Sequence, residues 1–220
     1  MALSLWAANE GSLALSGCFI TFEGGEGAGK STQVRLLAES LRQLGRDVVI
    51  TREPGGTIGA EAIRALLLDA DGPGWGARAE ALLFAAARAD HVDRLIRPVL
   101  ARGAWVICDR YLDSSRAYQG GAGGLGDEEI LALHRIGSKG LLPDLTVLLT
   151  LDAELARGRL LLRDAGQADR IGGRDDAYHA RVSAAFERFA AAEPKRFARI
   201  DAAGAPETVH RRVLAVLERL

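Results

Sequence analysis

The stretch Gly24-Gly25-Glu26-Gly27-Ala28-Gly29-Lys30-Ser31 decides the fold of this chain. It fits the pattern G-x-x-x-x-G-K-[ST], which requires a strand before it and a helix after it. Both are present in the pattern of the sequence, because residues 18–23 form an apolar run and residues 30–44 carry apolar side chains at helical spacing. Glycines let the backbone wrap closely around phosphate oxygens, so that N–H groups face the negative charge. We therefore predict that these eight residues bind the phosphates of ATP.

The last two residues of this loop carry most of its chemistry. Lys30 would bring a mobile cation to the β and γ phosphates, and the Ser31 hydroxyl is the expected ligand of Mg²⁺. Asp109 ends an apolar run and could merely cap a strand, but after a phosphate loop it is better interpreted as the acid near the metal. A glycine-rich turn could also simply connect two elements, in which case the Lys-Ser pair would be a coincidence. We predict Mg²⁺ as the cofactor and Lys30 as a catalytic residue.

Strands and helices alternate along the chain. Apolar runs predict strands at 18–23, 48–51, 105–109, 145–151 and 199–201. Helical spacing predicts helices at 30–44, 58–68, 77–102, 127–138, 153–162, 178–192 and 206–220, with a disturbance in the third at Pro98. This order predicts an α/β fold of the P-loop nucleotide kinase type, a five-stranded parallel sheet with helices on both faces.

Ligands of such a sheet bind outside the carboxyl ends of its strands, so the loop at 24–31, Arg52 and the pair Asp109-Arg110 should converge on one crevice. The glycine-dense stretches 55–56, 72–76, 120–126 and 172–173 are predicted to be loops at its rim.

Length and charge limit the possible partners. A chain of 220 residues with 48% hydrophobic content fits one domain, predicted at 18–220, and residues 1–17 are predicted to be a loosely ordered extension. The net charge of -1 gives no reason to expect nucleic acid or an anionic membrane as a partner. Cys18 and Cys108 lie in apolar runs and are predicted to be reduced core residues. With no apolar stretch near the roughly 20 residues of a membrane span and no basic signal sequence, we expect a soluble, cytoplasmic protein.

Several further segments resemble the bacterial thymidylate kinases. They are Phe22-Glu23-Gly24, Thr51-Arg52-Glu53-Pro54-Gly55-Gly56-Thr57, Phe84-Ala85-Ala86-Ala87-Arg88, and Asp109-Arg110-Tyr111 through Tyr118-Gln119-Gly120-Gly121. Shorter matches at 143–146, 169–171 and 200–202 carry the resemblance toward the C-terminus. The resemblance implies an ATP-dependent kinase that transfers the γ-phosphoryl group to dTMP, giving dTDP for dTTP synthesis. It also implies a homodimer.

The same resemblance indicates which side chains bind the acceptor. Arg52, Arg88 and Arg110 each offer a planar guanidinium, and three such groups suit a monophosphate dianion. Alone, Arg88 would more often be a solvated charge on a helix. Glu53 is predicted to hold one of these arginines, and Glu23 matches an acidic position near the acceptor.

Aromatic and hydroxyl side chains complete the predicted acceptor site. By resemblance, Phe84 stacks on the thymine ring, Ser114 or Ser115 touches the base edge, and Tyr118 lies against the deoxyribose. A tyrosine packed there would crowd a 2′-hydroxyl. Without the family pattern, Phe84 would more often be a core residue and Tyr118 a loop anchor.

An arginine-rich stretch near residues 163–176 resembles the mobile lid of nucleotide kinases, although by itself it could be a solvated basic helix end. Closure would exclude water and bring arginines to the transferring group. Because the phosphate loop contains no arginine, the chain resembles the type whose lid supplies it. We predict Arg110, Arg163 and Arg170 as catalytic residues.

Two other classes of function remain open at this point. A phosphate loop alone also suits another nucleoside monophosphate kinase, or a switch or regulatory NTPase that has no small acceptor. A switch should lack an arginine-lined acceptor pocket. A nucleic-acid-binding module is disfavoured by the near-neutral charge.

Overall fold

The computed structural model describes residues 17–164 and 173–220, except for the side chains of 161–164 and 219. Nearly all of the predicted extension and most of the predicted lid therefore lie outside the described residues. A parallel sheet forms the centre, in the order β2-β3-β1-β4-β5. Its strands are β1 (Phe19–Glu23), β2 (Val48–Arg52), β3 (Trp105–Asp109), β4 (Leu145–Thr150) and β5 (Phe197–Asp201). The predicted five-stranded parallel sheet is confirmed.

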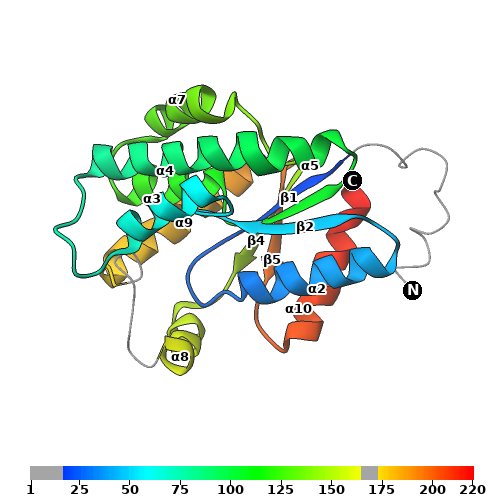
Figure 1. The fold of residues 1–220 in the computed structure, drawn as a ribbon. Coiled ribbons are helices and arrows are strands. Elements are labelled where there is room, and N and C mark those ends of the chain that lie inside the picture. Colours follow the sequence, from blue (N-terminus) through cyan, green and yellow to red (C-terminus); the bar gives the residue numbers. More distant parts are fainter. Residues whose placement is uncertain (1–16, 165–172) are drawn as a thin grey trace.

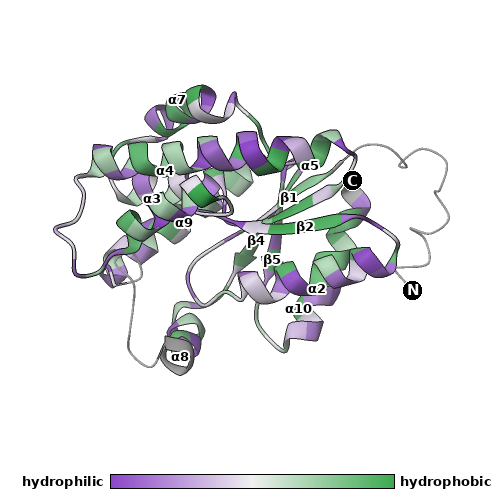
Figure 2. Cartoon of the chain, in the orientation of Figure 1, coloured by the Kyte–Doolittle hydropathy of each residue, from purple (hydrophilic) through white to green (hydrophobic). Residues whose placement is uncertain are grey.

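Helices cover both faces of this sheet (Figure 1). On one face, α2 (Lys30–Gln43) and α10 (Pro206–Val216) pack with the strands around Ile20, Phe22 and Leu37. On the other face lie α4 (Ala77–His91), α5 (Arg97–Ala101), α7 (Asp127–Ser138) and α9 (Asp176–Ala192). Figure 2 shows largely hydrophobic strands between helices that carry both hydrophobic and hydrophilic residues. Both cysteines are buried and free, as predicted.

The predicted helix at 77–102 is interrupted. After α4, residues Val92–Ile96 form a π-helical segment, η1, and α5 begins at Arg97. Pro98 has no N–H and its ring would clash with the carbonyl of the residue four positions earlier, so the regular hydrogen-bond ladder cannot continue through this region. The disturbance predicted at Pro98 is confirmed, but it lies on the N-terminal side of the proline.

Two short elements were not predicted. Helix α6 (Leu112–Ser115) follows β3, and the π-helical segment η2 (Arg116–Ala122) continues from it. The prediction of a loop over 120–126 is therefore wrong for residues 120–122, which complete η2. Their sequence is too short and too glycine-rich to show a helical period, so tertiary packing against α9 and α7 decides their conformation.

The remaining helices are α3 (Ile58–Leu68), α8 (Ala153–Asp164) and the short 3₁₀ segment η3 (Leu217–Arg219). Within the part of the chain that is described, each helix is too short or too polar to cross a bilayer. The sheet register sets the position of the site, because Asp109 at the end of β3 pairs with Phe22 of β1 and Arg52 of β2. The segments that follow these three strands therefore begin side by side.

Candidate functional site

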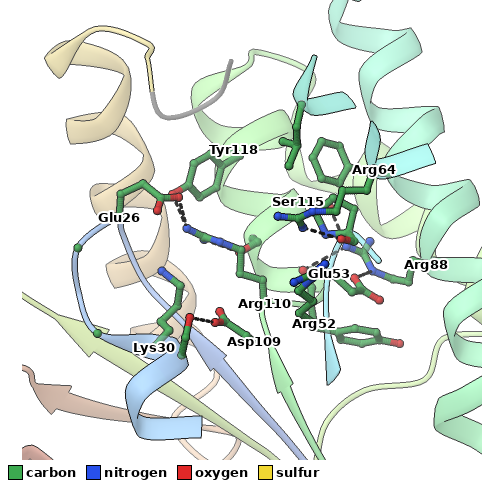
Figure 3. A pocket seen from close by; sticks show the side chains of 18 of the residues that line it. Glu26, Lys30, Arg52, Glu53, Arg64, Arg88, Asp109, Arg110, Ser115 and Tyr118 are labelled. Carbon is green, nitrogen blue, oxygen red and sulfur yellow. Dashed lines mark hydrogen bonds and ion pairs between the residues drawn. The ribbon is translucent and has the colours of Figure 1, made fainter. Parts of the chain in front are cut away.

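A cavity of about 490 Å³ opens at the carboxyl edge of the sheet. Its volume lies in the range usual for small-molecule sites. Most of the predicted site residues line it, as the close view in Figure 3 illustrates. They are Glu26, Gly27, Gly29, Lys30, Ser31, Arg52, Phe84, Arg88, Asp109, Arg110, Ser114, Ser115 and Tyr118. The structure therefore brings predicted ATP-binding residues and predicted acceptor-binding residues into one cavity.

The loop between β1 and α2 depends on glycine at specific positions. Gly24, Gly27 and Gly29 have φ angles of 132°, 73° and 87°, which L side chains rarely adopt. A Cβ atom on Gly24 would lie 2.3 Å from the carbonyl oxygen of Leu149. The loop therefore packs directly on the end of β4, and α2 starts at Lys30 with its N-terminus at the cavity.

Lys30 is held by the loop it belongs to. Its Nζ donates to the carbonyl oxygens of Gly24 and Gly25, at 3.1 and 2.7 Å. Burial, and next the nearby Arg110 guanidinium, lower the pKa of Lys30 to about 8. An anion placed here would relieve this unfavourable environment for a cation.

Ser31 and Asp109 form the predicted metal pair. The Ser31 hydroxyl donates to Oδ2 of Asp109 at 2.5 Å, although the two residues are 78 positions apart in sequence. A hydroxyl and a carboxylate are the hard oxygen donors that suit Mg²⁺. Their contact on the cavity wall fits the predicted cofactor.

Arg110 lies between the two ends of the cavity. Its backbone has a φ of 67°, and its N–H donates to the carbonyl oxygen of Phe22 at 2.9 Å. The guanidinium forms an ion pair with Glu26 and donates to Ser114 Oγ and Tyr118 Oη at 3.0 and 3.3 Å. Burial would lower the pKa of Arg110, but Tyr118 and the nearby acids outweigh it and raise the pKa. This side chain stays charged while it contacts both the phosphate loop and α6.

Glu23 lies beneath this contact and is fully buried. Its carboxylate accepts hydrogen bonds from the Tyr111 N–H and the Ser114 hydroxyl, at 2.8 and 2.6 Å. Burial, and next the proximity of Asp113, raise the pKa of Glu23 to about 8. The predicted residues Glu23, Gly24, Gly25 and Ala28 are absent from the described cavity wall. Glu23 thus meets the site through Ser114 in this structure.

Arg88 and Glu53 form a buried pair beside Phe84. Arg88 Nε donates to Glu53 Oε2 at 2.7 Å, and Nη2 donates to Ser115 Oγ at 2.8 Å and to the Tyr111 carbonyl at 3.1 Å. Burial would raise the pKa of Glu53, but Arg88 and His91 outweigh it and hold the pKa below its usual value. Glu53 therefore holds an arginine, as predicted. Two of the three nitrogens of Arg88 are occupied by protein partners.

The outer wall is formed by the loop after β2 and by α3. Arg52 is more exposed and donates to both carboxylate oxygens of Glu61 at 3.2 Å. Arg64, which the sequence argument missed, lines the cavity and donates to the carbonyl oxygen of Pro54 at 2.7 Å. Its only sequence signal is a cation on a helix that is apolar apart from Arg64 and Glu61, close after the Arg-Glu-Pro-Gly-Gly segment.

Tyr118 and Gln119, both from η2, also line the cavity. Gln119 Nε2 donates to Glu80 at 2.9 Å, and the Tyr118 carbonyl accepts from the Tyr178 hydroxyl at 2.8 Å. Gln119 was not predicted as a site residue, and the cavity wall contains further residues that were not predicted to bind a substrate, although Glu53 was predicted to hold an arginine. These are Thr32, Glu53, Pro54, Leu68, Tyr111, Arg159 and Leu160. Most of them are apolar or belong to helices whose place at the cavity depends on the tertiary fold.

Arg159 closes the cavity at the phosphate-loop end. Its Nη2 donates to the carbonyl oxygens of Ala202 and Gly204 at 3.1 and 3.4 Å, in the loop after β5. The predicted lid arginines follow on the same segment. The side chain of Arg163 and the whole of Arg170 lie outside the described residues.

Comparisons of the sequence and of the structure with known proteins all find thymidylate kinases. The family model described as thymidylate kinase matches residues 22–213. A thymidylate kinase of Rhizorhabdus wittichii is 57% identical over 206 residues, which cover 94% of this chain and 99% of that protein. A thymidylate kinase of a Bradyrhizobium species is 48% identical, over 93% of this chain and 91% of that protein. The crystal structure of thymidylate kinase from Ehrlichia chaffeensis is similar with a TM-score of 0.74 and 35% identity, over 92% of this chain and 99% of that one.

Proposed function

The chain belongs to the thymidylate kinase family, and we propose that it is a dTMP kinase that transfers the γ-phosphoryl group of ATP to dTMP and releases dTDP and ADP. One observation supports this proposal most directly. The phosphate loop and the arginines Arg52, Arg88 and Arg110, which suit an acceptor monophosphate, line the same cavity. A switch or regulatory NTPase needs only the phosphate loop.

ATP occupies the phosphate-loop half of the cavity. The amides of residues 24–31 and the N-terminus of α2 contact its phosphates, and Lys30 shifts from the loop carbonyls to the β and γ phosphates. Ser31 and Asp109 would hold Mg²⁺, which is generally required in this family and would neutralise charge on the phosphate oxygens when bound. Thr32 and Arg159 border the same end.

The acceptor dTMP occupies the half between Phe84, Arg52 and Tyr118. Phe84 stacks on the base, Tyr118 lies against the sugar, and Ser114 and Ser115 contact the acceptor edge. Arg52 binds the monophosphate, since its partner Glu61 is exposed and can be exchanged for a stronger anion.

Arg88 contributes to the acceptor site in a different way from Arg52. Its Nε and Nη2 are fixed by buried partners, and it follows Phe84 by one helical turn on α4. We therefore propose that Arg88 meets dTMP near the base rather than at the phosphate, in contrast to the expectation from the sequence. Its fixed guanidinium then selects the base by geometry.

The acceptor oxygen of dTMP is already ionised, so the reaction needs little general-base chemistry. Catalysis comes from alignment of the two substrates and from cations near the transferring group. Arg110 supports such a role because it contacts Glu26 of the phosphate loop and Ser114 of α6 at once. The loop has no arginine, so we propose that Arg163 and Arg170 add further positive charge from a lid at about 163–176.

Three further proposals rest on family membership. Residues 18–220 act as one kinase domain, and the protein works in the cytoplasm. The chain forms a homodimer, consistent with the apolar Leu82 of α4 and Ile136 of α7, which are 57% and 81% exposed.

The direct test is a coupled ADP-release assay with a panel of nucleoside monophosphates and Mg²⁺. We expect dTMP to stimulate ADP release far more than dUMP, dCMP, dGMP or AMP does. Stimulation by a different monophosphate would identify another nucleoside monophosphate kinase. ADP release that no monophosphate stimulates would favour a regulatory NTPase.

A further inference from the structure

His91 is a fully buried imidazole at the last residue of α4, and both of its nitrogens have side-chain partners. Nδ1 lies 2.9 Å from Glu53 Oε1, and Nε2 lies 2.7 Å from Thr51 Oγ1. The side chain therefore bridges the end of β2 and the loop that follows it. Neither the phosphate loop nor the predicted acceptor residues include it.

The Glu53 carboxylate continues this bridge to the cavity. Its Oε2 accepts from Arg88 Nε at 2.7 Å, while Oε1 faces His91. Arg88 in turn donates to Ser115 Oγ at 2.8 Å. Each carboxylate oxygen of Glu53 thus has its own partner, and the chain of contacts ends at two residues that line the cavity.

The surrounding backbone is fitted closely to the imidazole. Gly56 has a φ of 90°, and a Cβ atom there would lie 2.4 Å from Thr51 Oγ1 and 2.7 Å from His91 Nε2. The preceding residue, Asp90, accepts a hydrogen bond from the Thr57 hydroxyl at 2.5 Å, at the start of α3. The end of α4 therefore holds the whole loop from Thr51 to Thr57.

Hydrogen-bond chemistry assigns different tasks to the two nitrogens. Arg88 and His91 hold the pKa of Glu53 below its usual value against the effect of burial, so this carboxylate is ionised at neutral pH and can only accept. Nδ1 must therefore carry the proton and donate to Glu53. The Thr51 hydroxyl can complement Nε2 in either direction. Loss of the Nδ1 bond would free one oxygen of Glu53 and let its carboxylate, and Arg88 with it, change orientation.

We propose that His91 is a positioning residue for the acceptor half of the site, acting through the Nδ1–Glu53 hydrogen bond that fixes Arg88. The inference rests on the proposed function, because its readout is the affinity for dTMP. The Thr51 hydroxyl mainly provides a hydrogen-bond partner for Nε2 and so anchors the imidazole ring.

Two amide variants of His91 distinguish the contribution of Nδ1 from that of Nε2. His91→Asn keeps a donor near the position of Nδ1 and loses the contact with Thr51, whereas His91→Gln keeps a group near Nε2 and loses the contact with Glu53. We expect His91→Gln to raise KM for dTMP about tenfold, the equivalent of one hydrogen bond to a charged group. We expect His91→Asn to leave this KM within about twofold, and KM for ATP to stay unchanged in both.

Thr51→Val serves as a third variant, because it removes the partner of Nε2 without changing residue 91. It should lower the melting temperature and leave KM for dTMP within about twofold. Equal KM values for dTMP in the Asn and Gln variants, or a tenfold increase in either the Asn or the Val variant, would overturn the proposal. If His91→Gln does not fold, a tenfold increase of KM for dTMP in the Asn or the Val variant would still overturn the proposal. A wild-type protein that does not phosphorylate dTMP would instead reject the proposed function.

Discussion

The two halves of the cavity are built in different ways. The phosphate-loop half comes from one continuous segment between β1 and α2, and its contacts are mainly backbone groups of residues 24–31. The acceptor half draws side chains from β2, α4, the residue after β3, α6 and η2. Its charged members also bind each other in the core, as the Glu53–Arg88 pair does with side chains only 4% and 5% exposed.

Because of this difference, substitutions of charged residues in the two halves should affect activity and fold stability differently. Lys30 contributes a cation whose lowered pKa indicates an unfavourable environment in the folded protein, so its removal should not weaken the fold. Glu53 and Arg88 neutralise each other in the interior, and the loss of one partner leaves a buried charge. Loss of the Lys30 charge should therefore affect activity alone, whereas loss of one charge of the Glu53–Arg88 pair should affect both activity and stability.

The largest effect is expected for Lys30→Met. Because Lys30 supplies charge to the transferring phosphoryl group, kcat should fall about 10³-fold, while KM for dTMP changes little. The melting temperature should equal or exceed that of the wild type. Steady-state kinetics measure kcat and KM, and thermal unfolding measures the melting temperature. Near-normal turnover would reject the proposed role of the phosphate loop.

Glu53→Gln should show the opposite pattern for the acceptor half. It leaves the buried Arg88 guanidinium without an anionic partner, so the free energy of unfolding should decrease by about 3 kcal/mol. Chemical denaturation measures this change. The double variant Glu53→Gln/Arg88→Met removes both charges and should recover part of the loss. A single variant as stable as the wild type would show that the two halves do not differ as described.

The pH dependence of ATP affinity is the third test. With its pKa at about 8 in the free protein, Lys30 loses its proton above pH 8, and ATP binding must then restore it. Affinity for ATP should decrease above pH 8 by up to about tenfold per pH unit, which corresponds to 1.36 kcal/mol. Fold stability should rise in the same range, because the unfolded chain binds more protons there.

Lys30→Arg is the matched control for this experiment, since arginine stays charged throughout. The Lys30→Arg variant keeps Glu23, whose pKa is also about 8. A difference between the pH profiles of the wild type and the variant is therefore caused by the titration of Lys30. Calorimetric titration in buffers of different ionisation enthalpy measures the proton uptake directly. Parallel profiles in the two proteins would contradict the assignment.

Tyr118→Phe should have the smallest effect. The ring stays in place and only the hydroxyl that accepts from Arg110 at 3.3 Å is lost. We expect a change of about two- to threefold in the preference for dTMP over its ribonucleotide counterpart. Tyr118→Ala, which removes the ring, should reduce this preference further. Unchanged preference in both variants would remove Tyr118 from the sugar contact.

The sequence was most informative where one segment builds its own structure. The loop at 24–31, the alternating strands and helices, and the interruption near Pro98 could all be predicted, because the responsible groups are close in the chain. Helix α6 and the segment η2 could not, because seven residues with two adjacent glycines carry no periodic signal and rely on α7 and α9 for support.

Within the acceptor half, the sequence identified the type of each side chain but not its partners. It indicated three equivalent arginines, whereas the fold places Arg52 against an exposed glutamate, Arg88 in a buried ion pair and Arg110 between two elements. Their surroundings differ because Arg52 ends β2, Arg88 lies within α4 and Arg110 follows β3, and the packing of those elements sets the burial and the partners of each arginine. The sequence by itself determined the phosphate loop and the family, while the tertiary structure decided which charges are fixed, which remain exchangeable, and why His91 contacts Glu53.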